Sequence, residues 1–196
     1  MAADSADKSR RHRVLVQGLT PARKSAAQDP GNSAAQPAPF LVGHGYDIHR
    51  LQSGGKLLLG GVLVSEEFSP IAHSDGDVVL HALVDAILGA LGLGDIGELF
   101  PNSDPRWNDA PSRLFVEEVA RRMKQRNYSV SNLDVTILLE RPKIGAHKAQ
   151  IIASLRQLLG SGAVINVKAG TNEGCDAVGR GEAVAAHAVV LLASQS

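Results

Sequence analysis

Residues 74–92, SDGDVVLHALVDAILGALG, form the clearest helix pattern in the chain, and the rest of the domain must supply partners for its apolar surface. Ser74 or Asp75 is expected to cap the start of this helix, and Gly92 is expected to end it. Its apolar positions are Val78, Val79, Leu80, Leu83, Val84, Ile87, Leu88 and Leu91.

Strand and helix patterns follow one another along the chain from Phe40 onward. FLVGHGYDIH is typical of a first strand, and KLLLGGVLV of two short strands turned at Gly60 and Gly61, where glycine permits a positive φ. A second, amphipathic helix is predicted from Ser112 to Arg126. Its apolar residues near one stripe are Leu114, Val116, Val119 and Met123.

The remaining segments complete a mixed fold. They are the strand SNLDVTILLE, the loop and helix RPKIGAHKAQIIASLRQLLG, and the strands AVINVKAGT and EAVAAHAVVLLAS. The order predicts an α/β or α+β fold, with a mostly antiparallel or mixed sheet of about four to five strands and about three helices packed on it.

The composition fits one compact globular domain, because the chain has 196 residues, 20 basic and 20 acidic side chains, and is 44% hydrophobic. The balanced charge removes the electrostatic drive toward a nucleic-acid backbone. The single cysteine, Cys175, excludes an internal disulfide and a zinc site built from several cysteines. Apolar runs such as residues 183–194 are too short for a membrane-spanning helix, so no membrane anchor is predicted.

Residues 1–39 differ from the rest and are predicted to be a disordered extension of a domain that spans residues 40–196. Their Ala, Ser and Arg bias partly resembles an organelle transit peptide, against which Asp4, Asp7 and Asp29 count. The alternative is a mobile tail on a bacterial protein. The sequence therefore predicts a soluble protein and leaves bacterial cytoplasm and plastid stroma both open.

Two segments supply candidate metal ligands. Asp47 and His49 lie two apart on the first predicted strand, so their side chains point to the same side. On the main helix, Asp77, His81 and Asp85 share one face at i, i+4 and i+8. Asp47, His49 and His81 together would make a three-ligand zinc site with one open position. The alternative is a solvated surface pair on the strand and a polar stripe on the helix, with Asp77 stabilising the helix start.

The segment AHSDGD, residues 72–77, leads into the same helix. Because backbone N–H groups at a helix start are unpaired, this segment is suited to bind a phosphate beside His73 and Ser74. The alternative is a simple capping turn, which would not explain the presence of His73.

The segment VKAGTNE, residues 167–173, is a second candidate. Lys168, Thr171 and Glu173 offer a cation, a hydroxyl and a carboxylate there, and the alternative for Lys168 is a solvated strand residue.

Four motifs together resemble one family. GHGYDIHR, AHSDGDVVLHALVDAILGALGLGDIGELFP, DVTILLERPK and NVKAGTNE are similar to the motifs of the 2-C-methyl-D-erythritol 2,4-cyclodiphosphate synthases of the non-mevalonate (MEP) isoprenoid pathway. The resemblance covers residues 41–194. It implies a phosphorus–oxygen lyase that cyclises 4-diphosphocytidyl-2-C-methyl-D-erythritol 2-phosphate and releases CMP.

The resemblance also implies roles for individual residues. Zinc would be held by Asp47, His49 and His81, and a magnesium or manganese ion would be bound with help from Glu173. His73 and Thr171 would stabilise the transition state. Asp85 would contact one of the ligating histidines and orient it, without binding the zinc itself. The substrate-binding residues implied are Ser74, Asp95, Gly97, Phe100 and Asp104, with Arg180 as a further anion contact, and those around the cytidine are Leu139, Pro142, Lys143, Ile144 and Ala169.

The family resemblance implies a homotrimer whose active sites lie between subunits, acting on a small molecule without nucleic acid or membrane. This chain departs from the bacterial motifs at several positions. It has FPNSD with Asn102, KAGTNE with Gly170 and Asn172, and DAVGRGEA with Ala177. These departures put the substrate hydroxyl contact, the nucleotide side and any ligand of the trimer channel in doubt.

Two other functions fit the same residues. A zinc phosphohydrolase would use the same Asp and His set with a nucleophilic water in the open position. A non-catalytic trimer that binds CMP or isoprenoid diphosphates is the third possibility, which the departures at Asn102, Gly170 and Ala177 keep open.

Overall fold

The computed structural model describes residues 38–101, 103–107, 110–160 and 162–195. The predicted disordered extension lies, up to residue 37, outside these described residues, as does Asn102. The elements are β1 (Phe40–Ser53), β2 (Leu57–Leu59), β3 (Val62–Ser65), β4 (Phe68–Pro70), α1 (Val78–Leu91), α2 (Ile96–Leu99), η1 (Pro105–Trp107), α3 (Arg113–Gln125), β5 (Tyr128–Leu138), η2 (Ile144–His147), α4 (Lys148–Leu159), β6 (Val164–Gly170) and β7 (Ala183–Ser194).

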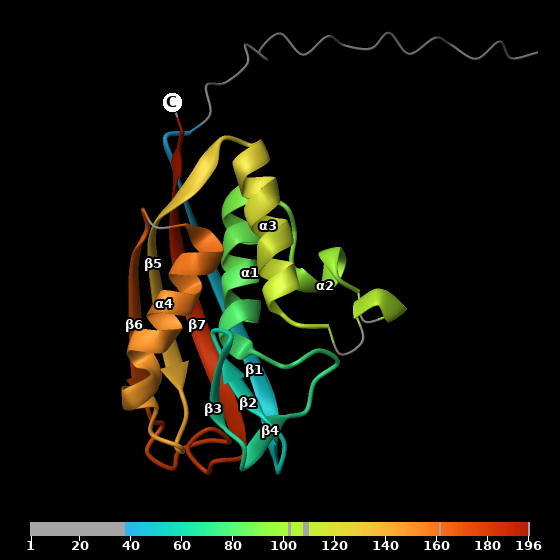
Figure 1. Ribbon diagram of the computed structural model, residues 1–196, viewed down its shortest axis with the longest axis vertical. Coiled ribbons are helices and arrows are strands. Elements are labelled where there is room, and N and C mark those ends of the chain that lie inside the picture. Colours follow the sequence, from blue (N-terminus) through green and yellow to red (C-terminus); the bar gives the residue numbers. More distant parts are fainter. Residues whose placement is uncertain (1–37, 102, 108–109, 161, 196) are drawn as a thin grey trace, which may run out of the picture. The chain divides into compact units, whose positions relative to one another are not determined.

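The main sheet has five strands in the order β4-β1-β7-β5-β6, and β2 and β3 form a separate hairpin. All neighbouring strands of the main sheet are antiparallel except β5 and β6, which are parallel. Helices α1, α3 and α4 lie together on one side of this sheet (Figure 1). The predicted fold class is therefore confirmed. None of the described helices is long and apolar enough to cross a membrane.

Helix α1 crosses the sheet directly over β1 and β7, and glycine makes this contact possible. A Cβ placed on Gly45 would overlap the carbonyl oxygen of Ala82 and lie 2.8 Å from Ala86 N, and one placed on Gly43 would overlap the carbonyl oxygen of Ala86. The bare strand and the small helix residues thus bring the two backbones into van der Waals contact. This contact fixes α1, and with it the position of every side chain on its inner face.

The start of α1 is capped by Asp77, so the prediction of Ser74 or Asp75 was wrong. The Asp77 carboxylate accepts hydrogen bonds from Val79 N and Leu80 N, each at 3.1 Å. It also accepts from Gly60 N at 2.8 Å and Gly61 N at 2.6 Å in the turn between β2 and β3. Because Asp77 is fully buried, it is no part of a solvated polar stripe. It ties the hairpin to the helix start.

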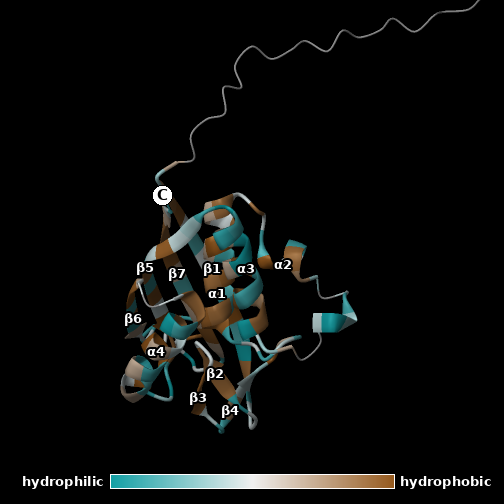
Figure 2. Ribbon diagram, turned by 45° about the horizontal axis from the view of Figure 1, so that its top comes forward, coloured by the Kyte–Doolittle hydropathy of each residue, from teal (hydrophilic) through white to brown (hydrophobic). Residues whose placement is uncertain are grey.

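The other local predictions are largely confirmed. Gly92 ends α1 in the left-handed conformation with φ 64°, and the Gly60–Gly61 turn also has positive φ values. On α3, however, Leu114 is exposed, and Phe115 takes its place on the buried stripe. Phe115 is spaced by four from Val119 and by eight from Met123, which is the spacing of one helix face. Figure 2 shows the contrast between the largely hydrophobic α1 and the hydrophilic residues of α3.

The side of the sheet opposite the helices is open in the single chain. Alternate residues of β1 are exposed there, and the neighbouring strands continue the pattern. The exposed apolar side chains of this open sheet face are Phe40, Val42, Tyr46, Ile48, Val164 and Val189. An apolar surface of this kind is a candidate contact for another chain.

The substitution Gly45→Ala is expected to push α1 away from β1, because the new methyl group would overlap the Ala82 carbonyl. We expect the free energy of unfolding to fall by about 1–3 kcal/mol, the usual cost of overpacking a core. The affinity of the candidate metal ligands for a zinc probe should also fall, since His81 on α1 would move away from Asp47 and His49. Urea denaturation and a zinc titration measure the two effects.

Gly89→Ala is the matched control, because Gly89 lies in α1 with open space at its Cβ position. This change should leave the stability unaltered or raise it by up to about 1 kcal/mol. Equal zinc affinity in the two variants would show that the glycine contact does not set the position of His81.

Candidate active site

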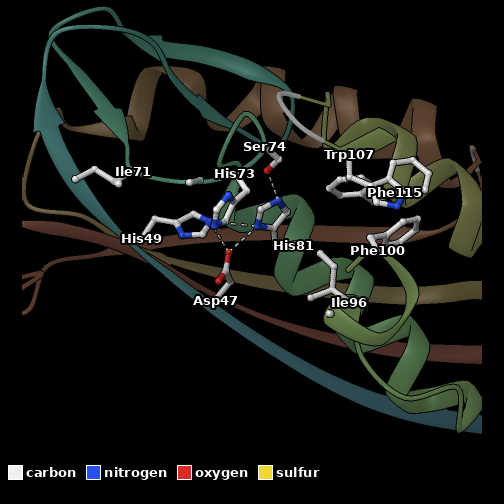
Figure 3. Close-up of a pocket in the computed structure, with 12 residues that line it drawn as sticks. Asp47, His49, Ile71, His73, Ser74, His81, Ile96, Phe100, Trp107 and Phe115 are labelled. Carbon is white, nitrogen blue, oxygen red and sulfur yellow. Dashed lines mark hydrogen bonds and ion pairs between the residues drawn. The ribbon is translucent and has the colours of Figure 1, made fainter. Parts of the chain in front are cut away.

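Three side chains from β1 and α1 meet at one end of the helix–strand contact. Asp47 and His49 point to the same side of β1, and His81 reaches them from α1 (Figure 3). His81 Nδ1 lies 2.9 Å from Asp47 Oδ2, and His49 Nε2 lies 3.2 Å from both Asp47 Oδ2 and His81 Nδ1. The structure thus brings together the three ligands that the sequence pattern predicted, with their ligand atoms all within 4.8 Å of one another.

The chemistry of these donors fits a divalent transition metal. Burial raises the pKa of the Asp47 carboxyl, but hydrogen bonds from the His49 and His81 imidazoles outweigh burial and hold that pKa well below its usual range. Asp47 is therefore ionised at neutral pH. One carboxylate and two imidazoles form a ligand set that zinc accepts, with a further position left for another ligand.

The second nitrogen of His81 is held by Ser112. His81 Nε2 lies 2.9 Å from Ser112 Oγ and 3.1 Å from Ser74 Oγ. Ser112 is fully buried; its hydroxyl donates to Asp75 Oδ1, and its backbone N–H donates to Asp75 Oδ2 at 2.9 Å. This arrangement leaves Nδ1 of His81 free to face Asp47 and fixes the plane of the ring.

Asp85 was predicted to orient a ligating histidine, but its hydrogen bond goes elsewhere. The Asp85 carboxylate accepts from Ile96 N at 2.7 Å, at the start of α2. Among the described residues, Ser112 occupies the orienting position that the prediction gave to Asp85. The reason is that α3 begins beside His81, a tertiary contact that no spacing within α1 could indicate.

The metal-ligand cluster opens into a cavity of about 330 Å³. Its residues are Asp47, His49, Ile71, Ala72, His73, Ser74, His81, Ile96, Gly97, Phe100, Trp107 and Phe115. Phe100 packs on Phe115 with ring centroids 4.5 Å apart and on Trp107 at 5.1 Å, so one end of the cavity is aromatic. His73 and Ser74, in the segment before the start of α1, line the cavity close to the cluster of Asp47, His49 and His81 (Figure 3).

Two of the predicted substrate residues have structural partners outside the cavity lining. Asp95 caps α2 by accepting from Glu98 N at 2.9 Å. Asp104 accepts from Arg106 Nε at 2.9 Å and 3.0 Å, and this contact lowers the Asp104 pKa. Gly97 and Phe100, by contrast, line the cavity directly.

Thr171, Glu173 and the predicted cytidine-side residues do not line this cavity. Ala169 lies within β6 and the others follow β5 or β6, and β6 is separated from β1 by β7 and β5 in the sheet. Thr171 Oγ1 donates to Glu173 Oε1 at 2.5 Å, and Glu173 has a positive φ of 49°. The side chains of Leu139 and Ile144 are buried.

Two other predicted cations are bound to carboxylates. Lys168 Nζ lies 2.6 Å from Asp134 Oδ2, and the Lys168 side chain is exposed on β6. Arg180 is exposed and forms an ion pair with Glu182 at 3.0 Å.

The sequence did not indicate several residues of the site. Ser112 was predicted only as the start of a helix, and nothing in its sequence context relates it to His81. The aromatic and apolar lining was also missed, apart from Phe100. The residues concerned are Ile71, Ile96, Trp107 and Phe115.

A carboxylate and two imidazoles that meet beside a cavity in an α/β domain form a candidate site for a divalent metal. The model of the YgbB family matches residues 40–193. The chain belongs to the YgbB family.

Curated relatives and solved structures agree with this assignment. The chloroplastic 2-C-methyl-D-erythritol 2,4-cyclodiphosphate synthase of Arabidopsis thaliana is 50% identical over 155 residues, which cover 79% of this chain and 67% of the relative. The synthase of Desulfosudis oleivorans is 50% identical over 152 residues, covering 77% of this chain and 90% of the relative.

Two solved structures share the fold. The bifunctional IspDF of Campylobacter jejuni matches with a TM-score of 0.76 and 35% identity. The match covers 79% of this chain and 42% of the longer Campylobacter protein. The IspF of Plasmodium falciparum, solved as a CDP complex, has a TM-score of 0.71 and 33% identity, covering 80% of this chain and 97% of that one.

Ser112→Ala is expected to weaken zinc binding by about 10- to 100-fold, the usual effect of losing a group that orients a metal ligand. The reason is that His81 Nε2 would lose its buried partner and keep only the Ser74 hydroxyl, so the ring would be held less firmly. Competition with a chelator of known affinity measures the change. Ser65→Ala in the hairpin is the control, and a zinc affinity of Ser112→Ala equal to that control would exclude an orienting role.

Proposed function

We propose that this chain converts 4-diphosphocytidyl-2-C-methyl-D-erythritol 2-phosphate into 2-C-methyl-D-erythritol 2,4-cyclodiphosphate and CMP, in isoprenoid precursor biosynthesis. The observation that carries the proposal is the convergence of Asp47, His49 and His81 in a cavity at the start of α1. It occurs in a chain that is 50% identical to a synthase named for this product. The activity is that of a phosphorus–oxygen lyase.

The reaction joins two anionic groups of one substrate. An oxygen of the 2-phosphate attacks the β-phosphorus of the diphosphate, and the bond between this phosphorus and the CMP oxygen breaks. No protein nucleophile is required. The chain must hold the two phosphates in line against their repulsion, which is catalysis by positioning and by electrostatic stabilisation.

The residues around the cavity suit this task. The first-turn N–H groups of Val79 and Leu80 are already bound by the buried Asp77 carboxylate, so the proposal assigns the phosphate contacts to Ser74 and His73, which line the cavity. In the proposal, His73 donates a hydrogen bond to a phosphoryl oxygen, and Thr171 does the same from the second part of the site. The aromatic end formed by Phe100, together with Gly97, faces the methylerythritol carbon chain and excludes water.

We further propose that zinc is the ion held by Asp47, His49 and His81. When bound, it supplies positive charge that neutralises and aligns phosphate oxygens. Glu173 would hold the second ion, magnesium or manganese, because hard divalent cations prefer carboxylate oxygen. Ser112, through His81 Nε2, keeps the ligand set in its binding geometry.

We propose a homotrimer in which each active site is completed by a neighbouring copy. Two observations support this. First, Thr171 and Glu173 do not line the chain's own cavity and lie beyond β7 and β5 from the metal ligands. Second, the open sheet face exposes apolar side chains such as Val42, of which 70% is exposed. A second copy packed over this face would bury it and bring the two halves of a site together.

The remaining assignments follow this arrangement. On the methylerythritol phosphate side, the proposed contacts are Ser74, Asp95, Gly97, Phe100 and Asp104. On the cytidine side they are Leu139, Pro142, Lys143, Ile144 and Ala169, with Arg180 as an anion contact. Asp85 contributes indirectly by anchoring α2. The plant relatives are named chloroplastic and the bacterial ones are not, so a plastid stroma and a bacterial cytoplasm are the two compartments that we propose.

The test is a time course by phosphorus NMR of the purified protein with this substrate, zinc and magnesium. The cyclic diphosphate and CMP should appear together, and a chelator should abolish both. CMP or inorganic phosphate without the cyclic product would instead establish a hydrolase. A zinc-loaded protein that binds CMP without turnover would be a binding protein.

His81→Ala is expected to lose zinc and turnover together, because it removes one of the three ligands. Thr171→Ala is expected to keep the zinc and to lower kcat by about 10²-fold or more, as is typical when one transition-state donor is removed. Zinc content and initial rates measure the two variants. Full zinc content in His81→Ala would contradict the ligand assignment.

Val42→Glu is expected to prevent assembly, because a charge would be placed on the open sheet face, and turnover should fall with it. Light scattering after gel filtration gives the mass of the particle. Leu63→Glu is the control, since Leu63 is an exposed apolar residue of the hairpin away from this face. A trimer of unchanged mass in Val42→Glu would remove the open sheet face from the interface.

A further inference from the structure

Two histidines lie side by side on the open sheet face, away from the metal ligands already described. His44 on β1 and His187 on β7 place Nε2 and Nδ1 3.2 Å apart, with ring centroids separated by 5.4 Å. In the strand register, His187 is paired with Tyr46 and His44 with Val189, so the two imidazoles are diagonal neighbours on adjacent strands.

The spacing of the two nitrogens is that of two ligands on one ion. Two ligands at about 2.0–2.1 Å from a tetrahedral zinc lie about 3.3 Å from each other. The same spacing separates His49 Nε2 from His81 Nδ1, 3.2 Å, in the first site. We propose that His44 and His187 form a second binding site for a divalent transition metal, on the opposite side of β1 from the first.

The alternation of side chains along β1 keeps the two sites apart. Asp47 and His49 point toward α1, whereas His44 and Tyr46 point to the open face. An ion at His44 and His187 therefore shares no ligand with the first site. Loss of one site should leave the other intact, which makes the two separately measurable.

The ligands are held in place before an ion binds. Both histidines lie within a continuous antiparallel pairing of β1 and β7, near the centre of the main sheet. The Tyr46 ring packs against His187 with centroids 4.7 Å apart, which limits the freedom of that imidazole. Little side-chain entropy is then lost on binding. Without metal, the same nitrogens share one hydrogen bond, whose proton the ion displaces.

The donor set selects the chemical class of the ion. Asp134 lies on the same face, but its carboxylate is bound by Lys168 Nζ at 2.6 Å and by Asn166 Nδ2 at 2.8 Å. The site thus offers two imidazole nitrogens and no free carboxylate from Asp134. Zinc, nickel and copper accept such a set, whereas magnesium and calcium require oxygen ligands. The remaining ligands would come from water or from a neighbouring copy packed over this face.

The experiment measures zinc bound to the full chain by equilibrium dialysis, with zinc alone as the probe and with the assembly state recorded in parallel. The unaltered chain should show two classes of zinc. His187→Gln and His44→Gln should each lose the second, weaker class and keep the first. His81→Ala should lose the first and keep the second. Tyr46→Phe is the matched control, because it contacts His187 without supplying a nitrogen, and it should retain both classes.

A second measurement follows the imidazole nitrogens by NMR during zinc titration of His81→Ala, in which the first site is disabled. The signals of His44 and His187 should shift together with added zinc and should not respond to added magnesium. The proposal would be overturned if these signals did not move, or if His187→Gln and His44→Gln bound as much zinc as the unaltered chain. Neither readout uses turnover, so the result is independent of the proposed cyclase activity.

Discussion

The close contact between the backbones of α1 and β1 determines the position of the candidate metal site. Gly43 and Gly45 leave no side chain between the strand and the helix, and Ala82 and Ala86 are small enough to complete the contact. His81 thereby comes within hydrogen-bond distance of Asp47 and His49. Because protein interiors are densely packed, a single added methyl group at this contact would displace His81 relative to Asp47 and His49.

Buried polar groups hold the elements around this contact. Asp77 satisfies backbone N–H groups of two separate segments, the Gly60–Gly61 turn and the first turn of α1. Ser112 links the start of α3 to His81 on one side and to Asp75 on the other. An unpaired polar group in such a place would be costly, so these bonds specify one arrangement of the hairpin, α1 and α3. The buried Asp77 carboxylate and the buried Ser112 hydroxyl thus support the candidate site through hydrogen bonds to separate elements.

The order of the main sheet divides the proposed active site in two. The candidate metal ligands belong to β1 and α1, whereas Thr171 and Glu173 follow β6, the strand at the far edge. The sheet itself cannot close this gap, because β7 and β5 lie between. An assembly that covers the open sheet face offers a physical reason for both the division of the site and the exposure of apolar residues on a strand such as β1.

The sequence by itself determined the features that repeat over short distances. The alternation of a strand placed Asp47 and His49 on one side, glycine fixed the Gly60–Gly61 turn and the end of α1 at Gly92, and the order of patterns determined the fold class. The convergence of Asp47, His49 and His81 could be predicted because two of them are local neighbours and the third lies on the helix with the clearest pattern.

Only the tertiary structure decided which distant groups meet. It made Asp77 the cap of α1, gave the orienting role on His81 to Ser112 where Asp85 had been expected, and buried Phe115 where Leu114 had been expected. Ser112 lies 31 residues from His81 in the chain, and no periodicity relates them. Side-chain spacing along one element follows from backbone geometry, whereas the partners of a buried polar group depend on how several elements pack against one another.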